Sequence, residues 1–157
     1  MKLSGIWFDL GEKEESDPYL VFKISTTKQP LFADQRFSVG HVYYKQVDDS
    51  GLIDIEIDIY TGRFVELTVI DVPTVRSDIT ISPHNRVDGL PIFSNHGLED
   101  NITSKSNSTI ERPLSIAKYN GKDVILIGKD MTPDFLIEFG SATFYFSNRE
   151  LCGIGTE

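Results

Sequence analysis

The sequence predicts a mainly β protein, in which antiparallel hairpins or a meander form a curved sheet or a sandwich of about eight to ten strands. Apolar and polar residues alternate with a period of two over most of the chain. These runs are rich in β-branched and aromatic residues, and turn sequences such as DDSG, YNGK and SNRE separate them. We expect at most one or two short helices, at Phe32–Val39 and Asp71–Ile79.

The expected strands are spread over both halves of the chain. In the first half they are Leu3–Phe8, Tyr19–Thr26, Phe37–Val47, Leu52–Ile59 and Arg63–Asp71. In the second half they are Leu114–Tyr119, Asp123–Gly128, Phe135–Phe139, Ala142–Ser147 and Leu151–Gly155. Between them, about residues 82–113 contain three prolines and a long polar run. We expect a long connecting loop there, with at most a short edge strand at Leu90–Phe93.

The most specific local prediction is a hairpin at Asn120–Gly121. This residue pair favours a type I′ turn, because both central positions of that turn need a positive φ. The resulting register sets Lys118 opposite Asp123 and Ile116 opposite Ile125. Opposite charges and apolar residues then pair across the two strands, which stabilises the hairpin.

The stretch LIDIEIDIYTGRFVELTVI, Leu52 to Ile70, predicts a second hairpin. A two-residue loop would mix apolar and acidic residues on each face, whereas a three-residue loop at Tyr60–Gly62 separates them. Gly62 then takes the left-handed position of a bulged turn. The expected apolar face holds Ile53, Ile55, Ile57, Val65, Leu67 and Val69. The opposite face, interpreted as a solvent-exposed carboxylate row, holds Asp54, Glu56, Asp58, Phe64, Glu66 and Thr68.

The length of 157 residues suits one domain with its own core. We expect a single β-rich domain over residues 1–157, with an N-terminal sheet at about 1–78 and C-terminal hairpins at about 114–157. The one cysteine, Cys152, permits no intrachain disulfide and is expected in the core of a protein from a reducing compartment. The chain lacks a signal-peptide pattern and a membrane-length apolar run, so the expected location is the cytoplasm.

The charge balance restricts the class of partner. The chain has 24 acidic and 15 basic residues, a net charge of −9. Nucleic acids and anionic membranes attract proteins of the opposite sign, so we expect neither as a partner. A negative charge is compatible with a protein partner that has a basic surface, and it also promotes solubility by itself.

Motifs for catalysis or cofactor binding are not found, and we expect neither an enzyme nor a cofactor. His41 lies within an expected strand and is interpreted as a half-buried sheet residue. A metal site could instead form in the central loop, where imidazole and carboxylate side chains are close in sequence. Its ligands would come from His84, His96, Asp88 and Asp100.

The chain combines an acidic hairpin, DIEIDIYTGRF, with a closing strand–turn–strand segment, FYFSNRELCGIG, and it has no catalytic motif. In this it resembles the immunity proteins of bacterial polymorphic toxin systems, including contact-dependent growth inhibition. The resemblance implies a non-catalytic protein that binds and neutralises a cognate toxin, often a nuclease with a basic groove. The residues expected to bind this partner are Asp54, Glu56, Asp58, Glu66, Tyr60, Phe64, Tyr43 and Tyr44.

Two other functions remain open from the sequence. The first is a small metal-dependent hydrolase with its site in the loop at residues 82–100. The second is a structural or assembly module whose exposed strand edges pair between copies. The sequence does not predict the oligomeric state, the order of the strands or the identity of the partner.

Overall fold

The computed structural model describes residues 1, 3–7, 23–30, 32–46, 51–71, 73–76, 81, 85–94, 107–129 and 132–156. These residues form strands, turns and bends, and the mainly β prediction is confirmed. Neither range suggested for a short helix is helical where it is described, since residues 32–35 form a turn and Thr74–Val75 is a strand. Within the described residues, no helix is long and apolar enough to cross a membrane.

The strands form two large sheets and one small one. The five-stranded sheet contains, in spatial order, β2 (Lys23–Ser25), β5 (Phe64–Asp71), β4 (Leu52–Asp58), β3 (Val39–Lys45) and β9 (Asn107–Glu111). The seven-stranded sheet contains β6 (Thr74–Val75), β10 (Leu114–Tyr119), β11 (Lys122–Ile127), β14 (Glu150–Thr156), β13 (Ala142–Ser147), β12 (Phe135–Phe139) and β7 (Asn85–Asp88). The small sheet pairs β1 (Leu3–Trp7) with β8 (Leu90–Phe93).

The described strands number fourteen, more than the eight to ten expected. The additions are the short strands β6, β7 and β9, each of which pairs in parallel at the edge of a large sheet. Two of them, β7 and β9, fall in the range 82–113, so the prediction of a loop is wrong for their residues, whereas β8 is the short strand expected at Leu90–Phe93. The side chains of β7 and β9 are mainly polar and exposed, because a short edge strand is held by backbone hydrogen bonds and needs no apolar face.

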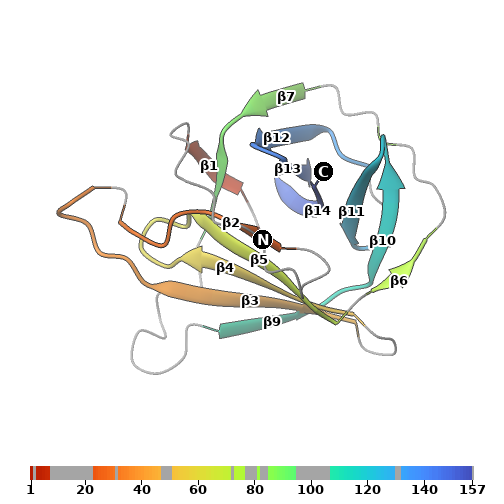
Figure 1. Cartoon of the computed structure of the whole chain (residues 1–157), viewed down its shortest axis with the longest axis horizontal. Coiled ribbons are helices and arrows are strands. Elements are labelled where there is room, and N and C mark those ends of the chain that lie inside the picture. The colour runs from red at the N-terminus through yellow and green to blue at the C-terminus, as the bar shows by residue number, and fades with distance from the viewer. Residues whose placement is uncertain are drawn as a thin grey trace.

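The main core lies between the two large sheets. The seven-stranded sheet curls above the five-stranded sheet in Figure 1, and both contribute fully buried side chains such as Ile55 and Ile154. The rings of Phe64 and Phe144 meet edge to face across this interface, with centroids 4.9 Å apart. The seven-stranded sheet buries a smaller apolar cluster as well, which includes Cys152 and confirms its place in a core.

The hairpin between β10 and β11 has the predicted register. Lys118 pairs with Asp123 and Ile116 pairs with Ile125. The turn residues Asn120 and Gly121 have φ values of 50° and 80°, as a type I′ turn requires. Local turn chemistry alone was therefore sufficient to predict this part of the fold.

The hairpin between β4 and β5 follows the prediction only in part. Ile53 pairs with Val69 and Ile55 with Leu67, as expected, and Gly62 has the predicted positive φ, at 75°. The loop has four residues, 59–62, because the Asp58 and Arg63 backbones still pair through an N–H···O bond of 2.9 Å. The predicted three-residue loop is therefore wrong.

The longer loop is compensated by a bulge in β5. Glu56 pairs with Glu66, but Ile57 pairs with Phe64, which leaves Val65 as an extra residue on β5. Phe64 therefore points into the main core, where Val65 was expected, and is fully buried. Val65 is buried outside that core.

The loop of this hairpin docks on β8. Gly62 donates its N–H to the Asp58 carbonyl at 2.7 Å and accepts a bond of the same length from the Phe93 N–H. A Cβ atom on Gly62 would lie 1.9 Å from the Phe93 carbonyl oxygen. The glycine is thus required twice, by its left-handed backbone and by the close approach of β8.

We expect Gly62→Ala to lower the free energy of unfolding by roughly 2–5 kcal/mol, since it adds overpacking to left-handed strain. Gly121→Ala is the matched control, because its φ is also positive but no atom lies within 4 Å of its Cβ position. The control should lose only about 1–2 kcal/mol. Urea denaturation of both variants measures the difference, and equal losses would contradict the docking contact.

Candidate functional site

The face of the five-stranded sheet that turns away from the main core carries a row of polar side chains. On β3 and β4, His41 pairs with Glu56 and Tyr43 pairs with Asp54. Glu66 on β5 pairs with Glu56, so the polar row runs across three strands from His41 through Glu56 to Glu66. Side chains on one face of neighbouring strands lie close enough to interact, both directly opposite and diagonally.

These residues form a charged group that we call the histidine–carboxylate cluster, made of Lys28, His41, Asp54, Glu56 and Glu66. His41 Nδ1 lies 2.8 Å from Asp54 Oδ2 and 3.9 Å from Glu56 Oε1. Lys28 Nζ lies 3.3 Å from Glu56 Oε2 and 3.1 Å from Glu66 Oε2. The cluster thus joins three strands to the segment that follows β2.

The cluster is not the solvent-exposed row that the sequence suggested. Asp54 is 9% exposed and Glu66 is 5% exposed, while Glu56 is partly buried. The expectation failed because it considered one hairpin, whereas β3 and the segment after β2 bring His41 and Lys28 against the carboxylates. Buried carboxylates need such partners, since loss of hydration is costly for a charged group.

The pKa values reflect this environment. Burial raises the pKa of Asp54 above its ordinary value, although the hydrogen bond and the charge of His41 oppose the shift. Burial also acts to lower the pKa of Lys28, but its contacts with Glu66 and Glu56 prevail and raise it. Lys28 is therefore held in its charged form by two carboxylates.

Asp58 has a structural role in the loop. It is 1% exposed, and its carboxylate accepts bonds from Thr61 Oγ1 at 2.7 Å, from Tyr60 N at 3.3 Å and from Ser38 N at 3.4 Å. This pattern is that of an aspartate that closes a turn. Its assignment to partner binding is therefore wrong, because its oxygens are directed into the protein.

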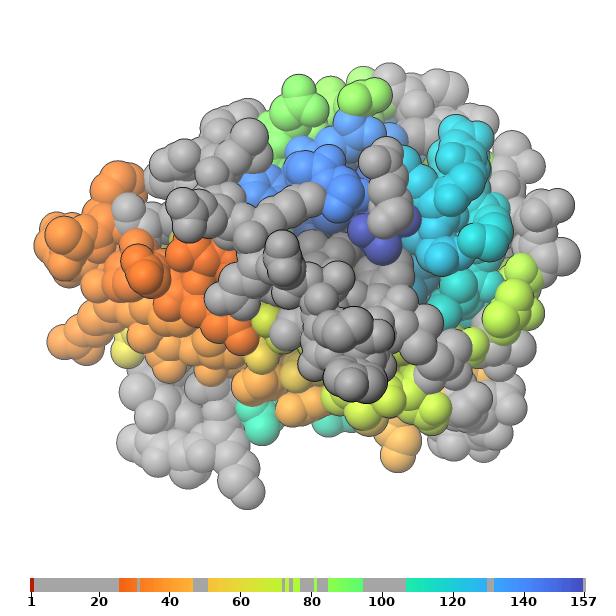
Figure 2. Space-filling model, viewed as in Figure 1, coloured from red at the N-terminus to blue at the C-terminus, as the bar shows by residue number. Residues whose placement is uncertain are grey.

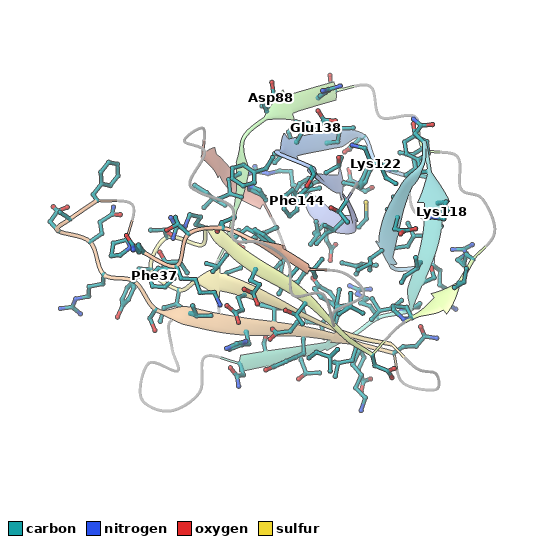
Figure 3. All side chains as sticks on the ribbon, viewed as in Figure 1. Phe37, Asp88, Lys118, Lys122, Glu138 and Phe144 are labelled. Atoms are coloured by element: carbon teal, nitrogen blue, oxygen red, sulfur yellow. The ribbon has the colours of Figure 1, made fainter. Side chains whose placement is uncertain are left out.

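Arg63, next in the hairpin, was not singled out in the sequence and is 1% exposed. Its Nη2 donates to the carbonyls of Thr27 and Gln29, at 3.1 and 2.7 Å. The guanidinium lies 5.6 Å from the ring centroid of Phe37, which Figure 3 places at one end of the five-stranded sheet. Burial lowers the pKa of Arg63, and the charge of Asp58 opposes this. Arg63 thus anchors the segment that carries Lys28.

That segment lies at the edge of the molecule. The described residues between 26 and 36 project at one end, where they are orange in Figure 2. Thr26 ties its start to β5, since its N–H donates to the Val65 carbonyl at 2.8 Å. Beyond it the side chains of residues 28–30 are exposed, and Lys28 reaches from there to the cluster.

The four aromatic residues expected to bind a partner are divided by the fold. Tyr60 is 41% exposed, and Tyr43 is partly exposed and stacks on His41 with ring centroids 5.9 Å apart. Tyr44 is 2% exposed, and its hydroxyl accepts a bond from the N-terminal ammonium of Met1 at 2.6 Å. Phe64 is fully buried. Tyr44 and Phe64 are therefore core residues, and their assignment to the surface is wrong.

The alternative metal site in the central loop is described only in part. His84, His96 and Asp100 lie outside the described residues, so their grouping remains a prediction. Asp88 is exposed on β7, at the edge of the seven-stranded sheet (Figure 3). Among the described residues, one group brings metal-ligating atoms together, and it consists of His41, Asp54 and Glu56. The pairing of β3 with β4, which the sequence did not predict, creates it.

Cys152 borders a cleft of about 220 Å³ that is also lined by Tyr44, Arg112 and Glu150. Its thiol lies 3.4 Å from the Tyr145 carbonyl oxygen, to which it donates. Burial raises the pKa of this thiol to about 12. A thiol that stays protonated at neutral pH is a poor nucleophile, so the structure offers no activated cysteine at this cleft.

Two comparisons with known sequences found no match for this chain. A scan against protein-family models finds no match, and a search of curated proteins finds none that is significant. The function must therefore be argued from the chain's own residues.

We expect Cys152 in the folded protein to react about 1,000-fold more slowly with a thiol reagent at pH 8 than in the unfolded chain. The rise of its pKa from 9.0 to about 12 reduces the thiolate fraction by about that factor. Absorbance of the released thiol product, followed with and without 8 M urea, measures the ratio. Similar rates in the two conditions would place the thiol in contact with solvent.

Proposed function

We propose that this chain is a non-catalytic binding protein that neutralises a cognate bacterial toxin in the cytoplasm, as an immunity protein does. Its partner would present a basic surface, as many nucleases do. The observation that carries this proposal is the excess of acidic over basic residues, 24 against 15, on a scaffold of packed sheets. Opposite charges accelerate the encounter of two proteins and disfavour partners of the wrong sign.

The position of this charge revises the original hypothesis. The described ranges contain 12 acidic and 12 basic residues, so the remaining sequence contains 12 acidic and three basic ones. The net charge of −9 therefore comes entirely from residues outside the described ranges. Attraction of a basic partner is a property of the whole chain and does not depend on the row of carboxylates on β4.

The contact residues are revised as well. Of the eight residues first assigned to partner binding, Tyr60, Tyr43 and Glu56 retain exposed surface. Tyrosine is well suited to anchor an interface, because it offers a large apolar ring and one polar group at low entropic cost. Tyr60 is the most exposed of the three and lies at the tip of the β4–β5 hairpin.

The other two functions have weaker support. Assembly through strand edges favours long exposed edges, whereas the outermost strands of both large sheets have two to five residues in the part of the chain that the structure describes. The metal-dependent hydrolase remains an alternative, and it depends on His84 and His96, which lie outside the described residues. Elemental analysis and the variants His84→Ala and His96→Ala would test it.

The direct test uses the product of the reading frame next to this chain's own. Expressed alone, that product should stop bacterial growth, and co-expression of this chain should restore it. Stopped-flow mixing of the two purified proteins should show an association rate that falls about 10-fold or more between 50 and 500 mM NaCl. Failure to restore growth, or a rate that is independent of salt, would count against the proposal.

A second test examines the contact surface. Tyr60→Ala should raise the dissociation rate of the complex by about 30-fold, which corresponds to about 2 kcal/mol for an anchor residue. Val75→Ala serves as the control, since Val75 is 75% exposed on β6, in the other large sheet. Equal dissociation rates for the two variants and the native chain would show that Tyr60 is not an anchor.

A further inference from the structure

We propose that His41, Asp54 and Glu56 form a binding site for one divalent transition-metal ion, and that zinc suits it best. The residues come from two adjacent strands, β3 and β4, whose pairing sets their positions. One ligand atom of each lies within 4.8 Å of the others. Zinc bonds of about 2.0–2.2 Å keep neighbouring ligand atoms about 3–4 Å apart, so small rotations of these side chains would complete the site.

A buried oxygen atom provides an independent reason to expect a ligand. Asp54 Oδ1 has no hydrogen-bond partner among the described residues, although the residue is only 9% exposed. The other oxygen of the same carboxylate, Oδ2, lies 2.8 Å from His41 Nδ1, so a cation bound by His41 would have this carboxylate within reach. An unsatisfied buried carboxylate oxygen is costly. A bound cation would satisfy it.

The charges of the cluster lead to the same conclusion. Among the described residues, Lys28 contacts two of the three carboxylates, Glu56 and Glu66, and His41 contacts the third, Asp54. Lys28 contacts the Oε2 atoms of both glutamates, which leaves Glu56 Oε1 on the side of His41. With His41 in its neutral form, which a metal ligand requires, negative charge remains uncompensated between Asp54 and Glu56. A divalent cation at this point would balance it.

The ligand types select the metal. Calcium and magnesium prefer sites made wholly of oxygen atoms, whereas one imidazole with two carboxylates suits zinc and neighbouring transition metals. The surroundings orient two of the three ligands, as outer-shell groups do in metal sites. Tyr43 stacks on the ring of His41 with an interplanar angle of 8°, and Lys28 holds the far oxygen of Glu56. The metal proposal does not rest on the proposed toxin partner, although Glu56 and Tyr43 belong to both sets of residues.

The test uses the full chain, freed of metal with a chelator and then titrated with zinc in a calorimeter. We expect saturation at one ion per chain. His41→Ala, Asp54→Asn and Glu56→Gln should each weaken binding more than about 100-fold, since loss of an outer-shell contact alone costs about 10–100-fold. Glu111→Gln should bind as the native chain does, because Glu111 is an exposed carboxylate on β9 of the same sheet.

Cobalt provides a measurement that does not depend on variants. Co²⁺ added to the native chain should give visible absorption bands typical of a low-coordinate site, and one equivalent of zinc should remove them. Absence of one-to-one binding, or zinc binding unchanged in all three ligand variants, would overturn the proposal. Should a ligand variant fail to fold, the cobalt titration and the remaining variants still decide the question.

Discussion

The structure depends on the register shift that Val65 introduces in β5. Val65 is the extra residue of a bulge and has no partner of its own on β4. The β5 residues that precede it therefore pair with β4 one position away from where a regular ladder would place them. Phe64 therefore enters the main core, where its ring meets Phe144 at 4.9 Å. Without the bulge, strict alternation would place Phe64 on the face turned away from the core. The contact between the two large sheets would then lose its central aromatic pair.

The same shift organises the polar face. Arg63 immediately precedes Phe64 and is buried with it, so its guanidinium must find partners within the protein. It finds the carbonyls of Thr27 and Gln29, and this fixes the backbone on both sides of Lys28. Lys28 in turn contacts Glu56 and Glu66. The position of Lys28 in the histidine–carboxylate cluster is therefore a consequence of the register of one hairpin.

The sequence was informative where structure is local. The ends of β10, β12 and β13 agree with the predicted ranges, and the Asn120–Gly121 turn set the register of its hairpin. Short edge strands were missed, since β7 and β9 carry little apolar pattern. The bulge at Val65 was missed because a three-residue loop satisfies the same alternation, and contact with β8 favours the longer one. The cluster needed the pairing of β3 with β4, which no local signal encodes.

The acidic residues of this chain can be of two physical kinds, which the sequence alone does not separate. Charges that attract a distant partner must remain hydrated and act together, so their position on the fold matters little. Charges withdrawn from water interact strongly with their immediate neighbours, so their geometry matters greatly. Asp54 and Glu66 belong to the second kind, because each is less than one-tenth exposed. Their charges therefore act at short range within the cluster, whereas the proposed steering of a basic partner would rest on acidic residues elsewhere in the sequence.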